Sequence, residues 1–196
     1  MRPMSGKPPS KSPEALWAEL EALPPGIKGE IIGGTLYTQP RPLALHQHVR
    51  TLIGADLLGG YQRGRGGPGG WRILAEPGVR ILPHEEFSPD IAGWRKERLP
   101  RIPDGAITLV PDWICEVQSK GTRAYDIEVK RAFYASIGVG WLWYVDPKPR
   151  TLYVSRLENG RWVEMGMWTG RHTVKAMPFD EVTLDLAEWW DDEGEE

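Results

Sequence analysis

The chain has 196 residues, one cysteine and a formal net charge of −3 at pH 7. That length suits one domain with a substantial core, and the acidic balance gives no global positive field for nucleic acid, although local patches can still bind it. A single cysteine excludes a disulfide framework, and the longest apolar stretch, 137–145, is too short to cross a bilayer. The first residues carry no apolar signal segment. We therefore expect a soluble cytoplasmic protein without membrane contact.

The N-terminal third predicts a tail, a helix, a hairpin and a second helix. Residues 1–12 are rich in Pro, Ser and Lys and are expected to be disordered. Ser12 is placed to cap a helix over 13–23. The segment 29–37 is typical of a hairpin that turns at its two central glycines, and 42–58 has apolar residues at helical spacing.

The remaining segments predict a mostly stranded domain. A glycine-rich loop spans 59–70, a basic irregular stretch follows the second strand, and one helix lies between the central strands. Expected strands cover 71–82, 88–94, 113–117, 141–145, 151–157, 161–168 and 172–176, and expected helices cover 123–137 and 183–190. This order predicts a mixed α/β (α+β) domain over 13–190, followed by the acidic tail 191–196.

Lys130 lies where the central helix should be apolar. At about 100° per residue, it falls inside the apolar arc, between Ile137 and Tyr134. The other members of that arc are Ile127, Val129 and Phe133. A lysine directed at the interior needs a carboxylate or an anionic ligand to offset its desolvation. The pattern therefore predicts a buried acidic partner for Lys130.

Two carboxylates, Asp90 and Glu116, precede Lys130, each on a short apolar run. Glu116 and Gln118 are two residues apart on a strand and therefore face the same side. If the two strands pair, both carboxylates lie close together and can bind Mg²⁺, which would activate water for attack on a phosphodiester. Lys130 would orient the nucleophile or stabilise the anion. These residues predict a metal-dependent phosphodiesterase site.

A simpler alternative is an ordinary helix ion pair between Asp126 and Lys130, which are four residues apart. Such a pair contributes roughly 0.2–0.5 kcal/mol on an exposed helix face. Both residues fall in the apolar arc, however, and unpaired buried charges are rare. The pattern therefore favours a site over the surface pair.

The segment around these residues carries a family resemblance that covers about residues 27–157. Its motif residues are Ser88-Pro89-Asp90, Pro111 to Val117, Ser119, Thr122, Tyr125-Asp126, Lys130, Tyr134, Trp143 and Val145-Asp146-Pro147. Upstream, Gly29-Glu30, Gly33-Gly34 and His46 match the group's N-terminal hairpin and helix. This pattern resembles the Uma-type group of restriction-endonuclease-like proteins, within the PD-(D/E)xK nuclease superfamily.

The resemblance implies a central mixed sheet flanked by helices and a Mg²⁺-dependent DNA endonuclease, with Mn²⁺ as a possible substitute. It implies Asp90 and Glu116 as metal ligands and Glu30 as a further acidic member of the catalytic set. Gln118 occupies the position of the superfamily's signature lysine, and the group's lysine is moved to the following helix, here Lys130. The resemblance also implies a homodimer, a cleft lined by His46 and Tyr134, and no nucleotide cofactor.

Basic residues near the predicted site could contact DNA phosphates. Arg95, Lys96 and Arg98 follow the Asp90 strand, and Arg63 and Arg65 lie on the glycine-rich loop, where they could clamp DNA. Runs of charged residues are more often solvated loops than binding surfaces, so a solvated loop stays open as the alternative to a DNA contact. The strand tryptophans, which could stack on bases, are expected in the core instead.

Two rival functions remain open at this point. A catalytically silent binding or regulatory module would explain Gln118 at the lysine position, the acidic net charge and the lack of a second, target-reading domain. A nuclease that acts on RNA or branched DNA would use the same residues, and nothing in the sequence separates those substrates.

Overall fold

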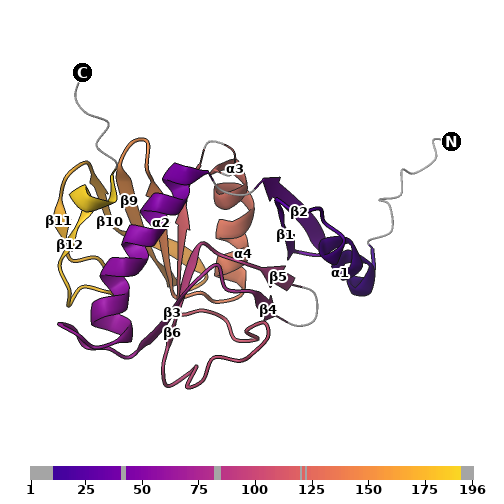
Figure 1. Cartoon of the computed structure of the whole chain (residues 1–196), viewed down its shortest axis with the longest axis horizontal. Coiled ribbons are helices and arrows are strands. Elements are labelled where there is room, and N and C mark those ends of the chain that lie inside the picture. Colours follow the sequence, from indigo (N-terminus) through magenta and orange to yellow (C-terminus); the bar gives the residue numbers. More distant parts are fainter. Residues whose placement is uncertain (1–10, 41–42, 82–84, 120, 122, 191–196) are drawn as a thin grey trace.

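The computed structural model describes residues 11–40, 43–81, 85–119, 121 and 123–190. The predicted acidic tail 191–196 and nearly all of the predicted disordered segment 1–12 lie outside the described residues. Figure 1 shows two neighbouring units: a large sheet with its helices, and a smaller sheet with the first helix.

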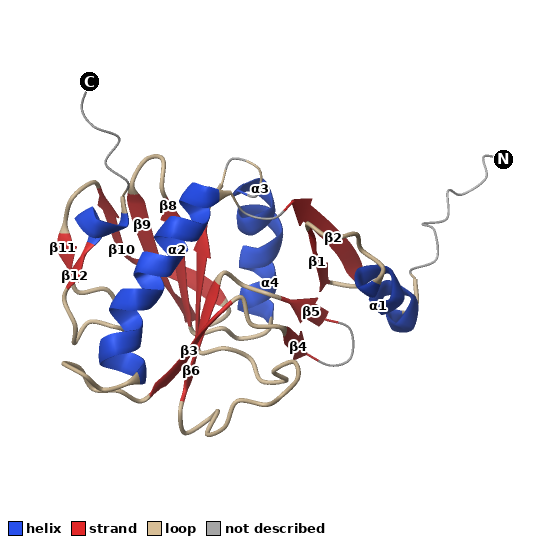
Figure 2. Cartoon of the chain, viewed as in Figure 1, coloured by secondary structure: helices blue, strands red, loops and turns tan. Residues whose placement is uncertain are grey.

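The large sheet has six strands in the order β10-β9-β8-β7-β6-β3 (Figure 2). Its strands are β3 (Trp71–Ala75), β6 (Ile91–Arg95), β7 (Trp113–Val117), β8 (Trp141–Asp146), β9 (Thr151–Glu158) and β10 (Arg161–Thr169). Only β7 and β8 are parallel among these pairs. A parallel pair needs a crossover connection, which α3 (Arg123–Tyr125), η2 (Asp126–Lys130) and α4 (Arg131–Ser136) supply. The predicted mixed α+β domain is confirmed.

Helices cover both faces of the large sheet, because its central strands are apolar on both sides. Helix α2 (Ala44–Leu57) packs Val49 and Ile53 in the same cluster as Cys115 of β7. The adjacent β7 residue, Ile114, points to the opposite face and clusters with Phe133 of α4. This alternation follows the two-residue period of a strand. Strand β7 is therefore buried on both faces, as is usual for a parallel strand under a crossover helix.

The smaller sheet has the strand order β2-β1-β5-β4 and carries α1 (Pro13–Glu21). Its strands are β1 (Ile27–Ile32), β2 (Thr35–Pro40), β4 (Val79–Ile81) and β5 (Glu85–Phe87). The hairpin of β1 and β2 turns at Gly33 and Gly34, as the sequence predicts, and both have positive φ, 58° and 68°. Positive φ at both central residues defines a two-residue turn that suits the strand twist.

Several elements differ from their predicted form. The expected strand over 71–82 is two strands in different sheets, separated at Glu76 and Pro77, where Glu76 has φ 45° and Pro77 cannot donate a hydrogen bond. The expected helix over 123–137 winds as a π-helix over 126–130. The expected C-terminal helix is limited to a 3₁₀ turn, η3 (Leu186–Trp189), after the short pair β11 (Thr173–Val174) and β12 (Leu184–Asp185).

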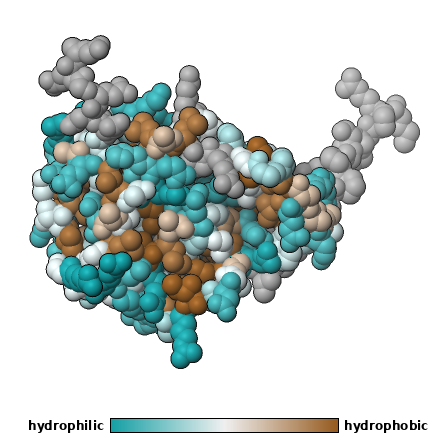
Figure 3. All heavy atoms as spheres, viewed as in Figure 1, coloured by the Kyte–Doolittle hydropathy of each residue, from teal (hydrophilic) through white to brown (hydrophobic). Residues whose placement is uncertain are grey.

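The outer surface is mixed in character. On the face viewed in Figure 3, apolar residues gather toward the centre among hydrophilic ones. Within the described residues, no helix is long and apolar enough to cross a membrane.

Aromatic rings fill the core on the α2 side of the large sheet. The ring of Phe179 lies 4.9 Å from that of Trp71, 4.8 Å from Trp113 and 5.5 Å from Trp143, measured between centroids. Phe179 is fully buried, and so is Trp143. The prediction that the strand tryptophans are core residues is confirmed for Trp113 and Trp143.

Replacing Phe179 with alanine should destabilise the protein by about 3–5 kcal/mol, because a cavity opens among rings that cannot fill it. Urea unfolding followed by tryptophan fluorescence measures this loss. Met167→Ala is the control, since Met167 is 53% exposed and its loss should change stability by less than about 0.5 kcal/mol. An equal cost in both variants would contradict the packing described here.

Candidate functional site

Four charged side chains from four different elements meet below the surface. Asp90 directly precedes β6, Glu116 lies on β7, Lys130 ends η2, and Glu30 lies on β1. Each is 5% exposed or less. The gathering of two strand carboxylates and one helix lysine, predicted from the sequence, is therefore present in the folded chain.

Strand register brings Asp90 and Glu116 together. Strands β6 and β7 are antiparallel with Ile91 opposite Cys115, so Asp90 stands opposite Glu116. The backbone N–H of Asp90 donates to Glu116 Oε2 at 3.3 Å, and the N–H of Val117 donates to Asp90 Oδ2 at 2.8 Å. Directly opposed residues of an antiparallel pair place their side chains on the same face.

Lys130 joins the two sheets through its ammonium group. Its Nζ donates to Glu116 Oε1 at 2.9 Å and lies 3.1 Å from Glu30 Oε2. The Asp126 carboxylate, four residues earlier, is 3.9 Å away and is the longest of the three contacts. The simple helix pair thus exists only as part of a buried network that spans both sheets.

Hydroxyl and backbone donors orient the acidic groups. Tyr134 donates to Glu116 Oε1 at 2.5 Å, and Tyr125 donates to Glu30 Oε2 at 3.1 Å. The other oxygen of Glu30 accepts from the Ser88 N–H at 2.8 Å. These bonds hold two carboxylates toward Lys130 from both sides. Tyr134, expected to line a cleft, instead lies fully buried behind Glu116.

His46 approaches the site from α2. Its Nε2 lies 2.9 Å from Asp90 Oδ2, and the side chain is 6% exposed overall. Among the described residues, its Nδ1 has no hydrogen-bond partner.

The site carries more negative than positive charge. Burial, hydrogen bonds and neighbouring charges together shift the pKa values of its carboxyl groups. Burial raises the pKa of Glu116 to about 8; the Lys130 charge opposes this rise, and the Asp90, Asp126 and Glu30 charges add to it. Burial also acts to raise the pKa of Asp90. The hydrogen bond and charge of His46, together with the charges of Lys28 and Lys130, outweigh burial and hold the value at about 2. A negative pocket of this kind favours a bound cation.

The arrangement fits a two-carboxylate magnesium site. Mg²⁺ is usually bound through one or two carboxylates, with water and substrate phosphate completing its shell. Asp90 and Glu116 can supply those carboxylates from opposed strand positions. Within the described part of the chain, no three His, Cys, Asp or Glu side chains are grouped so that they could hold a metal ion.

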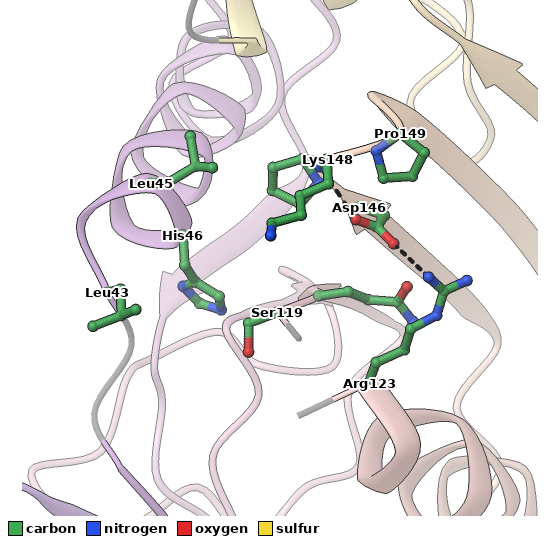
Figure 4. A pocket seen from close by; sticks show the side chains of 10 residues that line it. Leu43, Leu45, His46, Ser119, Arg123, Asp146, Lys148 and Pro149 are labelled. Carbon is green, nitrogen blue, oxygen red and sulfur yellow. Dashed lines mark hydrogen bonds and ion pairs between the residues drawn. The ribbon is translucent and has the colours of Figure 1, made fainter. Parts of the chain in front are cut away.

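Figure 4 shows a cleft of about 490 Å³ that is lined by His46, whose ring contacts Asp90. It lies between the start of α2, the end of β7 and the turn that joins β8 to β9. Its lining residues are Leu43, Leu45, His46, Gln118, Ser119, Arg123, Asp146, Pro147, Lys148 and Pro149. His46, expected to line a cleft, does so, and Gln118 also lines it although it is only 4% exposed.

The basic residues expected to contact DNA lie elsewhere. Arg95 is five positions beyond Asp90, which places it about 16 Å along β6 at the strand's other end. Its guanidinium stacks over the Trp71 ring at 4.1 Å. Lys96 donates to the Gln62 carbonyl at 2.7 Å, and Arg98 pairs with an aspartate at the same end.

Arg63 and Arg65 are exposed on the segment after η1 (Leu58–Gln62), which the fold does not bring to the carboxylates. The DNA-contact role of these five basic residues stays a prediction. Sequence reasoning missed Arg123 and Lys148, which line the cleft. The available signal was position, because Lys148 directly follows the Val145-Asp146-Pro147 motif and Arg123 follows Thr122.

Replacing Lys130 with methionine should cost about 3–5 kcal/mol at pH 8, because buried carboxylates then lose their cation while the side-chain stem is kept. The cost should shrink at pH 5. Carboxyl groups whose pKa is raised in the folded state are protonated at pH 5. They destabilise the folded protein only as the pH rises above the pKa that they have in the unfolded chain.

Urea unfolding of the variant and wild type at both pH values measures this effect. Lys148→Met is the matched control, because Lys148 is exposed and its loss should leave the unfolding free energy nearly unchanged. A Lys130→Met variant as stable as wild type at pH 8 would contradict the ion-pair network.

Comparisons with known proteins agree with this architecture. The model of the Uma2 family, described as "Putative restriction endonuclease", matches residues 17–187. A solved structure from Anabaena variabilis ATCC 29413, titled a "putative nuclease belonging to DUF820", is similar in fold, with a TM-score of 0.67 and 20% identity over 89% of this chain and 96% of that one. No curated protein matches. The predicted restriction-endonuclease-like fold is confirmed, and the chain belongs to the Uma2 family of restriction-endonuclease-like nucleases.

Proposed function

We propose that this protein is a nuclease that uses Mg²⁺ or Mn²⁺ to hydrolyse phosphodiester bonds of DNA. The observation that carries the proposal is the opposed pair Asp90 and Glu116, with the Lys130 ammonium 2.9 Å from Glu116. Membership of a nuclease family supports the reaction class. The choice of metal rests on the two carboxylates, and the choice of DNA rests on the restriction-endonuclease family.

Asp90 and Glu116 would hold the metal, which when bound lowers the pKa of a water and offsets charge on the phosphate. The N–H of Val117 and the His46 ring fix one oxygen of Asp90. Tyr134 fixes Glu116 by its hydroxyl group. These contacts hold the carboxylates in place before substrate arrives, which lowers the reorganisation that the reaction requires.

Lys130 would orient the attacking water and stabilise the developing phosphorane charge. Its ammonium reaches Glu116 from the helix side, while Gln118 occupies the strand position of the superfamily's signature lysine. Glu30 holds Lys130 from the smaller sheet at 3.1 Å. The Lys130 contact thus supports an active site despite the missing strand lysine.

Purified wild-type protein should nick supercoiled plasmid DNA in Mg²⁺, and excess chelator should stop the reaction. Asp90→Asn, Glu116→Gln and Lys130→Met should each lower the rate by about 100-fold or more, because each removes a charge that acts on the reacting phosphate. Agarose-gel time courses measure the rates. Asp112→Asn is the control, since this carboxylate pairs with Arg98 at the far end of the sheet. Wild-type rates in the three site variants would reject the site.

A catalytically silent binding module is the second candidate, and Gln118 at the signature lysine position favours it. Calorimetric titration with Mn²⁺ separates the two candidates. Heat of binding that disappears in Asp90→Asn supports the nuclease, and no binding by the wild type supports the silent module. A homodimer stays a prediction, which sedimentation measurements can check.

A further inference from the structure

One wall of the cleft is formed by apolar side chains that are exposed to solvent and are not part of the hydrophobic core. Leu43 is 82% exposed and Leu45 is 40% exposed, although both sit at the start of α2 where the helix meets the cleft. Pro149 faces them from the β8–β9 turn (Figure 4), and Pro147 also lines the space. Apolar side chains left exposed around a concavity often mark a binding site.

Part of the cleft lining is polar and cationic. Figure 4 shows the Lys148 side chain extending across the cleft toward His46. Among the described residues, the Lys148 ammonium forms no hydrogen bond or ion pair, whereas Arg123 is held by Asp146 at 3.0 Å. An ammonium kept without a protein partner inside a cleft is available for an anionic group of a ligand.

His46 links the cleft to the carboxylates. The ring is more than nine-tenths buried, lines the cleft, and has an Nδ1 atom without a partner among the described residues. A buried nitrogen left unpaired costs free energy unless something else bonds it. Nε2 of the same ring contacts Asp90 at 2.9 Å, so a molecule in the cleft would lie one side chain away from that carboxylate.

The size of the cleft sets the class of ligand. About 490 Å³ lies within the range of roughly 300–1,000 Å³ that is usual for small-molecule pockets. This volume suits a single nucleotide, whose planar base would meet the apolar side chains that line the space. A base within a duplex would have to leave the stack to enter.

We propose that the cleft binds one unpaired nucleotide of the substrate strand, with its base between the leucine and proline walls and a phosphate on Lys148. This inference rests on the proposed nuclease function and refines it, because it places an unstacked nucleotide next to the Asp90 and Glu116 carboxylates. The preferred substrate is therefore DNA with a single-stranded segment, such as a flap or a free strand.

Binding of fluorescent oligonucleotides tests the proposal independently of cleavage. Anisotropy in Ca²⁺ would compare a single strand, a flap and a blunt duplex of equal length with the full-length protein. The wild type should bind the single strand and the flap at least about tenfold more tightly than the duplex. Leu43→Ser and Lys148→Ala should each weaken single-strand binding by about fivefold or more, within the range for single base contacts.

Salt dependence and matched variants make the test specific. Lys148→Ala should reduce the slope of log affinity against log salt concentration by about 0.7, the value for one phosphate contact on a single strand. Leu43→Ser should leave that slope unchanged. The controls are Met167→Ser and Lys175→Ala, which alter exposed residues that do not line the cleft.

Failure of this inference is distinguishable from failure of the nuclease function. Equal binding of duplex and single strand, with no effect of either cleft variant, overturns the nucleotide cleft even if plasmid cleavage depends on Mg²⁺ and Asp90. Loss of cleavage and metal binding, with strand preference intact and sensitive to Leu43 and Lys148, supports the cleft and rejects the nuclease reaction.

Discussion

The site depends on the buried ammonium group of Lys130. Lys130 donates to Glu116 of the large sheet and contacts Glu30 of the smaller sheet, and all three side chains are almost fully buried. Desolvation of an ammonium group is costly, so its burial is tolerated only while both carboxylates stay in place. The contact therefore makes the hairpin unit a part of the site, and a displacement of either sheet would leave a charge buried without its partner.

The charge balance of the pocket explains why its acidic groups differ so much from one another. Burial raises the pKa of Glu116 to about 8, with the neighbouring carboxylates adding to the rise, whereas His46 holds the pKa of Asp90 low against the effect of burial. Two opposed carboxylates of unequal acidity beside one lysine make a pocket that a divalent cation would bring closer to neutrality. Electrostatic demand, hydrogen bonding and strand register point to the same chemistry.

The cleft connects this pocket to the surface through shared residues. His46 contacts Asp90 on one side and lines the cleft on the other, and Gln118 lies on the strand that carries Glu116. Lys148 reaches in from the turn after β8, the strand that runs parallel to β7. A substrate held in the cleft would therefore lie next to the carboxylates because the parallel strands end at the same edge of the sheet.

Local patterns in the sequence were sufficient to identify Lys130, Asp90 and Glu116, because helical and strand periodicities decide which way each side chain points. The turn at 33–34 was likewise predicted from its two glycines. Which of these segments lie side by side was decided by long-range strand pairing.

The sequence alone could not predict the contact between Glu30 and Lys130. That contact joins two sheets, and no local sequence pattern determines how two sheets pack. The sequence offered Arg95 as a phosphate contact beside Asp90, but a strand carries each residue about 3.3 Å further on, so Arg95 lies at the other end of β6. Lys148, far from Asp90 in sequence, reaches the cleft because β8 lies parallel to β7. The sequence determined which residues carry charge. Tertiary packing selected the direction and register of the strands, and these decided which charges meet.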